Sequence, residues 1–228
     1  MQIFKPLFAL GVGCLAVLGT PIASLLDHHK RSTVDPSAVS LDVRAVPNVV
    51  KVELWDGLGT GTKTNPTYKA KLSTGIVGNP THADVAEYAR KGWEHMMTQS
   101  PRQKDTHLMA ALYIPTRRSL FLSSVPDGPA IGHINDDGAT AAPAWWSQVQ
   151  NRQPPRVLHA EDSAASLYED SLTTKLAAGA QYPTGSFIAV YGIVNGKAKD
   201  AVPLCSGGGD RPLDPPCQTV FTNLGVGF

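Results

Sequence analysis

The amino-acid sequence predicts an α/β protein in which helices flank a mixed β-sheet in a three-layer arrangement. Short segments with alternating or continuous apolar residues are typical of strands, and amphipathic helical patterns lie between them. The expected order is strand, helix, hairpin, helix, strand, loop, helix and strand stub, without a visible internal repeat. Helix and strand patterns that are interleaved along one chain favour a layered α/β domain.

The first 45 residues instead carry the pattern of an export signal followed by a linker. Lys5 precedes an apolar run from Leu7 to Gly19, and small residues continue to Ser24, which is the order of a secretory signal peptide. The run of about 13 residues is shorter than the roughly 20 residues of a membrane-spanning helix. We expect a signal peptide over 1–24, a linker or pro-segment over 25–45, and a mature protein that is secreted to the extracellular space without a membrane span.

The charge balance argues against a protein that grips long nucleic acids. The chain has 20 basic and 19 acidic residues. Without residues 1–31, which end at the dibasic pair Lys30-Arg31, 17 basic and 18 acidic residues remain. That pair is either a cleavage site or part of a solvated linker. Proteins that neutralise many phosphates carry a basic excess or stripe. We therefore expect a small substrate, or a nucleic acid held in a local groove.

The predicted domain covers residues 46–228 and begins with a strand over 48–55, in which Val50, Val52 and Leu54 share one face. Thr81 has the residue type and spacing of a helix N-cap, because Asp84 follows three residues later and apolar residues continue at helical spacing. The other elements expected in this half are a short strand near 68–72 and a hairpin with strands over 109–114 and 120–125.

The second half begins with a Gly-, Pro- and Asp-rich segment over 126–156, which we expect to be an irregular insertion with one short helix over 144–150. A helix over 159–179 and a buried strand over 185–196 follow. The chain then forms a Pro- and Gly-rich loop, a short helix from Cys217 with Gly225 at its end, and a strand-like stub at its last residues.

The residues His159-Ala160-Glu161 stand at a predicted helix start and suggest either a metal site or the polar start of a surface helix. With Cys14 in the signal peptide, the exported chain keeps Cys205 and Cys217. In an oxidising compartment such a pair forms a disulfide most simply. However, Cys217 lies at a helix N-terminus, which favours the thiolate that binds metal. Two cysteines and one histidine would complete a catalytic zinc site whose fourth position is left to water.

The combination of "HAE" with a downstream "PPC" that opens a helix resembles the zinc-dependent deaminases. Residues from about 80 to 228 are similar in element order to the cytidine deaminase-like superfamily, which has secreted toxin-type members. The resemblance implies that His159, Cys205 and Cys217 ligate Zn²⁺ and that Glu161 is the catalytic proton shuttle. It implies hydrolytic removal of an amine from a nucleobase in a nucleoside or a nucleic acid.

Two features depart from the family pattern. The family usually has two residues between its cysteines, whereas eleven separate Cys205 from Cys217, so that this pair either binds metal or closes a disulfide loop. The chain also stops at Phe228, where members of the family continue with another helix and strand. One hypothesis is that the strand over 48–55 occupies the vacant place in the sheet.

Trp145 and Trp146 lie in the long insertion and suggest either a stacking platform for a base or a hydrophobic plug beneath the loop. The alternative to an enzyme is a secreted effector or binding protein of the same fold. In that alternative Cys205 and Cys217 form a disulfide and there is no metal site.

Overall fold

The structure of the protein is a computed structural model, which describes residues 46–55, 66–73, 79–99, 107–152, 158–199, 202–205 and 215–228. All of these belong to one compact unit, Val43–Phe228. The predicted signal peptide over 1–24 and linker over 25–45 lie outside the described residues. No helix within the described ranges is long and apolar enough to cross a membrane.

The centre of the fold is a six-stranded sheet with the order β1-β2-β4-β3-β5-β6. Its strands are β1 (Glu53–Leu54), β2 (Tyr68–Leu72), β3 (His107–Ile114), β4 (Ser119–Ser124), β5 (Phe187–Val194) and β6 (Lys197–Lys199). Every pair of these strands is antiparallel. The prediction of a mixed sheet is therefore wrong for these strands, and parallel pairing in the described residues is confined to an isolated bridge between Phe187 and Gly227.

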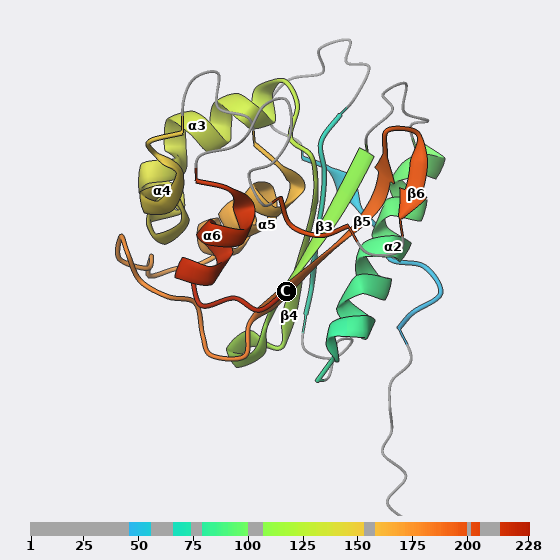
Figure 1. The fold of residues 1–228 in the computed structure, drawn as a ribbon, viewed down its shortest axis with the longest axis horizontal. Coiled ribbons are helices and arrows are strands. Elements are labelled where there is room, and N and C mark those ends of the chain that lie inside the picture. The colour runs from blue at the N-terminus through green and yellow to red at the C-terminus, as the bar shows by residue number, and fades with distance from the viewer. Residues whose placement is uncertain are drawn as a thin grey trace, which may run out of the picture. The chain divides into compact units, whose positions relative to one another are not determined.

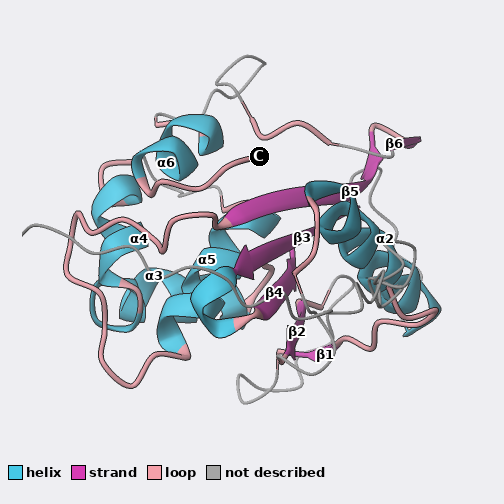
Figure 2. Ribbon diagram, turned by 90° about the horizontal axis from the view of Figure 1, so that it is seen from below, coloured by secondary structure: helices cyan, strands magenta, loops and turns pink. Residues whose placement is uncertain are grey.

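Helices cover both faces of the sheet, as Figures 1 and 2 show, and this confirms the expected layered α/β architecture. One face carries α2 (His82–Gln99), whose buried side chains join a core with β2 and β3. The other face carries α5 (Ala160–Asp170), with a second core formed by the remaining helices. These are α3 (Pro129–Ala141), α4 (Pro143–Val149) and α6 (Cys217–Asn223).

Several local patterns produce the elements that were expected from them. The hydroxyl of Thr81 accepts the Asp84 N–H at 3.2 Å, and the Asp84 carboxylate accepts the Thr81 N–H at 2.7 Å, so α2 begins with the predicted capping pair. The predicted hairpin is formed by β3 and β4, which are joined by the short 3₁₀ turn Pro115–Arg117. Strand β2 has the expected bounds.

The segment over 126–156 was expected to be irregular apart from one short helix over 144–150. That helix is confirmed as α4, but the expectation of irregular structure is wrong for residues 129–141, which form α3. Composition suggested a loop, but Ala130, Ile134 and Gly138 are buried on one side of α3. A Cβ on Gly138 would lie 2.5 Å from the Trp146 ring, so glycine is required for this close helix contact. Tertiary packing therefore overrides the low helix propensity of glycine.

Three predicted boundaries also differ from the structure. The strand over 48–55 is regular only in β1, although Val50 and Val52 are buried as expected. Helix α5 ends at Asp170 instead of continuing to 179, and the Lys175 ammonium donates to the carbonyls of Glu169 and Asp170 at this end, at 3.2 and 2.8 Å. The short strand β6 was expected to be part of a loop.

The hypothesis that the strand over 48–55 takes the vacant place beside the C-terminal stub is wrong. Strand β1 pairs with β2, which pairs with β4 on one side of the sheet. Gly227 instead bridges Phe187 of β5, on the other side of the sheet. The N-terminal strands therefore extend the sheet at the opposite edge.

Candidate metal centre

His159 occupies the N-cap position of α5, at the point where the chain enters the helix from extended backbone with φ −99° and ψ 175°. The Asp162 carboxylate accepts the His159 backbone N–H at 2.9 Å. This local hydrogen bond fixes the first turn of α5 and thereby the direction in which the histidine side chain leaves the backbone. The imidazole is half-buried beside the start of α6.

Cys217 is the first residue of α6, and Cys205 is held against the same helix end. The Cys217 backbone N–H donates to the Cys205 sulfur at 3.0 Å, and the Gln218 N–H donates to the Cys205 carbonyl at 3.1 Å. The first N–H groups of a helix have no partner inside the helix. Their use here explains how a cysteine that precedes Cys217 by twelve positions is bound beside it.

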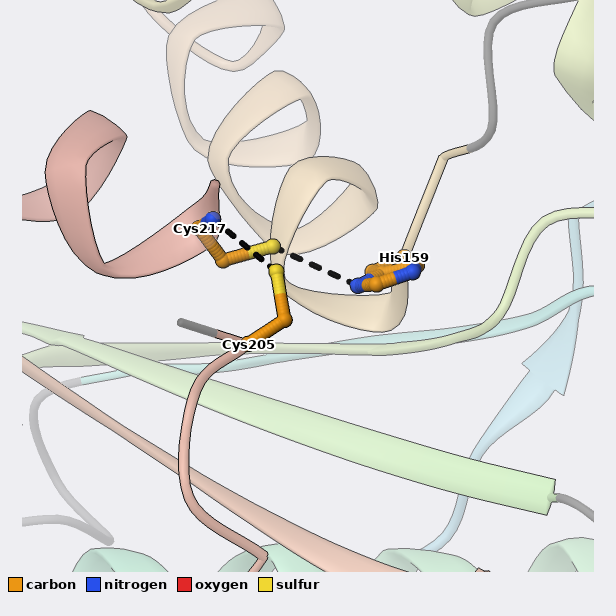
Figure 3. Close-up of side chains that lie close together, drawn as sticks. All are labelled: His159, Cys205 and Cys217. Atoms are coloured by element: carbon orange, nitrogen blue, oxygen red, sulfur yellow. Dashed lines mark hydrogen bonds between the residues drawn. The ribbon is translucent and has the colours of Figure 1, made fainter. Parts of the chain in front are cut away.

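The structure brings together the three candidate ligands that the sequence resemblance implied, as Figure 3 shows. Their ligand atoms all lie within 4.8 Å of one another, and the Cys217 sulfur is 3.3 Å from Nδ1 of His159. Zinc prefers four ligands in a tetrahedral arrangement, in which neighbouring ligand atoms are roughly 3.5 to 4 Å apart. The three atoms are therefore close enough to share one metal ion, and two sulfurs with an imidazole nitrogen are donors of the kind that zinc binds. Both cysteines are free thiols in the structure.

The three ligands strongly affect one another's protonation. Hydrogen bonding with Cys217, followed by that with His159, outweighs burial and lowers the pKa of Cys205 to about 5. The neighbouring Cys205 sulfur, followed by burial, raises the pKa of the Cys217 thiol. Burial disfavours the charged imidazole of His159, but the Cys205 sulfur and nearby carboxylates outweigh it and raise its pKa to about 9. A metal that binds here must displace protons from this cluster.

Glu161 lies two residues beyond His159 and is almost completely buried, with 3% of its surface exposed. Its Oε2 atom has no hydrogen-bond partner among the described residues. Burial raises the pKa of Glu161 to about 7, although the nearby His159 lowers it in part. A carboxyl group with a pKa near 7 can both accept and donate a proton at neutral pH. This is the property that a proton shuttle requires.

Asp162 supports the start of α5 through its hydrogen bonds. Besides the His159 N–H, it accepts the Trp145 indole N–H at 3.1 Å and the Arg152 guanidinium at 2.8 Å. Arg152 was not singled out from the sequence, since a single arginine in a Pro-rich stretch carries no distinguishing signal. Its importance is visible only from its contacts.

The two tryptophans lie in different environments. Trp145 is completely buried, and its indole N–H is bonded to Asp162, so its ring packs in the core instead of facing a ligand. This burial contradicts the stacking role considered for Trp145 and agrees with a hydrophobic plug. Trp146 is partly buried against the same core.

Comparison of this chain with protein-family models, with curated proteins and with solved structures finds no match. The candidate centre therefore rests on the residues and their geometry.

Proposed function

We propose that this chain is a secreted zinc-dependent hydrolase of the cytidine deaminase-like type, which removes an amino group from a nucleobase in a nucleoside or a nucleic acid. The observation that carries the proposal is the cluster of His159, Cys205 and Cys217, whose candidate ligand atoms lie within 4.8 Å of one another. The buried carboxyl group of Glu161 follows two residues after the histidine. Neither the cluster of candidate ligands nor the carboxyl group alone would suggest this reaction.

The order of the surrounding elements gives further support. Hairpin β3–β4, helix α5, strand β5 and helix α6 occur in the order that the resemblance implies, with α3 and α4 inserted before α5 and β6 inserted before α6. Residue Gly227 then lies parallel to β5 at the bridge with Phe187, where the next strand of such a fold would run. These features support the family resemblance through topology, independently of the three ligands.

His159, Cys205 and Cys217 would hold the zinc ion. When bound, zinc supplies Lewis acidity that activates water for attack on an amine-bearing carbon. Glu161 would take up a proton from the attacking water and deliver it toward the leaving amine, and its raised pKa suits both transfers. The burial of its carboxyl group excludes bulk water and leaves Oε2 available for this exchange.

The charge balance is consistent with a small nucleoside substrate or with single bases presented in a local groove, because the chain carries nearly equal numbers of basic and acidic residues. The alternative is a secreted binding protein with a disulfide between Cys205 and Cys217. The closeness of the two sulfurs is also compatible with that alternative, so the test must separate the two.

The test combines metal analysis, thiol titration and a deamination assay on the purified protein. We expect about one zinc per chain, loss of zinc in His159→Ala, and ammonia release from at least one member of a panel of nucleosides and single-stranded oligonucleotides. Glu161→Gln should retain zinc and lose activity by about 100-fold or more, which is the usual contribution of general acid–base catalysis.

The matched control for the histidine variant is His133→Ala, because His133 pairs with Asp137 on α3 and takes no part in the metal cluster. This variant should keep both zinc and activity. A metal-free protein without free thiols would refute the enzyme and favour the disulfide-containing binding protein. Zinc binding without ammonia release from any nucleobase would refute the proposed substrate class.

A further inference from the structure

A buried ion pair between Arg152 and Asp162 makes hydrogen bonds to the chain at the starts of both α5 and α6, the helices that carry His159 and Cys217. Nη1 of Arg152 is 2.8 Å from Oδ2 of Asp162, and their side chains are 1% and 0% exposed. Buried ion pairs contribute little to stability compared with apolar residues of similar volume, because the desolvation of both charges is costly. The contacts of this pair therefore suggest a role other than stabilisation of the fold.

The first half of the connection runs through Asp162 to the histidine ligand. The same Oδ2 atom that meets Arg152 accepts the His159 N–H at 2.9 Å. The other carboxylate oxygen accepts the Trp145 indole N–H at 3.1 Å. Asp162 is thus held in place by α4 and by Arg152, and it holds the backbone of His159 in turn.

The second half runs from the same guanidinium to the cysteine ligand. Nε of Arg152 donates to the carbonyl of Pro215 at 3.0 Å. Pro215 and Pro216 lead directly into Cys217, and proline restricts φ at both positions. A hydrogen bond at Pro215 therefore restrains the start of α6 and, with it, the position of the Cys217 sulfur.

We propose that Arg152 is the positioning residue of the metal centre, where its guanidinium joins the start of α5 to the start of α6 and so sets the separation of His159 and Cys217. This inference rests on the proposed metal site and deepens it, because it assigns the preorganisation of the ligands to one side chain. Arginine suits the role, since its rigid fork donates in two fixed directions, which a lysine ammonium cannot reproduce.

Electrostatics support the same assignment. Burial disfavours the charge on Arg152, but Asp162 and then the two cysteine sulfurs outweigh it and raise its pKa. The guanidinium therefore stays charged next to groups that are negative when they bind metal. Its Nη2 atom is buried without a hydrogen-bond partner among the described residues.

The test compares zinc affinity in four variants by competition with a chromophoric chelator under reducing conditions. Arg152→Met removes the hydrogen bonds to both Asp162 and Pro215. Arg152→Lys keeps the positive charge but lacks the planar guanidinium that donates in two fixed directions. Arg152→Met/Asp162→Asn removes the pair together, so that no charge is buried alone if the single variant fails to fold. The matched control is Arg117→Met, since Arg117 contacts Ser171 beyond the far end of α5.

We expect all three Arg152 variants to bind zinc at least tenfold more weakly than the unchanged protein, as is usual when an outer partner of a metal ligand is lost. The control should stay within twofold. The absorption spectrum of the cobalt-loaded protein should change in the Arg152 variants and not in the control. Zinc affinity restored by Arg152→Lys, or a folded double variant with unchanged affinity and spectrum, would overturn the positioning role.

A metal-free experiment separates this inference from the proposed function. If the unchanged protein binds no zinc, the proposed function fails, and the restraint that Arg152 places on the two helix starts is then measured by amide hydrogen exchange. In Arg152→Met the His159 and Cys217 backbone N–H groups should exchange at least tenfold faster than in the unchanged protein, because the Asp162 and Pro215 contacts that fix the starts of α5 and α6 are lost. Exchange at these two amides equal to that in Arg117→Met would overturn the inference.

Discussion

Replacement of Gly192 by alanine should strongly destabilise the sheet where β5 pairs with β3. Gly192 has φ +153° and lies opposite Leu108 in the register of these strands. A Cβ at this position would lie 2.0 Å from the His107 carbonyl oxygen and 3.0 Å from the Leu108 Cα. Both atoms belong to the backbone of a paired strand, so no side-chain rotation can relieve the contact.

The expected cost follows from this geometry. Overpacking of a well-packed site costs about 1 to 3 kcal/mol, and an unfavourable backbone conformation adds about 1 kcal/mol or more. We therefore expect Gly192→Ala to lower the free energy of unfolding by roughly 3 kcal/mol. For a domain of this size, that corresponds to a decrease in Tm of about 6 to 12 °C.

Urea unfolding followed by circular dichroism tests this prediction, and Gly196→Ala is its control. Gly196 has φ +73°, and a Cβ there would have no neighbour within 4 Å, so its replacement carries only the backbone cost of about 1 kcal/mol. Equal losses of stability in the two variants would show that the close approach to His107 does not determine the requirement for glycine.

Three further predictions concern buried groups and the metal. Tyr182→Phe removes the hydroxyl that donates to the buried Glu169 carboxylate at 2.8 Å, and it should lower the free energy of unfolding by about 1.5 to 3 kcal/mol. A loss below about 0.5 kcal/mol, which is typical of a neutral surface substitution, would contradict this. Burial raises the pKa of Glu169 above 4.5, so its folded-state proton is held more tightly, and stability should fall as pH rises from 4.5 through the raised pKa. Glu169→Gln should remove this slope, and parallel stability–pH curves for the two proteins would refute it. Zinc at about 100 times its Kd should stabilise the fold by about 2.7 kcal/mol, so that a chelator lowers the Tm of the unchanged protein and not that of Cys217→Ser.

The periodic elements were the parts of the fold that sequence patterns predicted well. Helix α2 and the β3–β4 hairpin follow from capping residues, apolar spacing and a central turn, all of which act within a few residues. Strand β6 also had a local signal, since Asn195-Gly196 is a typical hairpin turn and both residues have positive φ in the structure. The two residues were instead assigned to the end of the predicted strand over 185–196, and the following residues to a loop.

Helix α3 could not be inferred in the same way, because its sequence is rich in glycine and aspartate. It is stabilised by contacts with α4 and α5, which are invisible to a local pattern. The early end of α5 is different, because Lys175 caps the carbonyls of Glu169 and Asp170 from only a few residues further along the chain. Tertiary contacts therefore outweighed local propensity in α3, whereas the end of α5 is a local feature.

By itself, the sequence determined the chemical types of the candidate ligands and the helix starts that carry His159, Glu161 and Cys217, because residue identity and capping are local properties. Only the tertiary structure decided that Cys205 lies within reach across eleven intervening residues, through N–H groups that α6 leaves without internal partners. It also decided that Trp145 is buried and that Arg152 joins the starts of α5 and α6. These arrangements depend on hydrogen bonds between residues far apart in the chain, which the spacing of residue types does not encode.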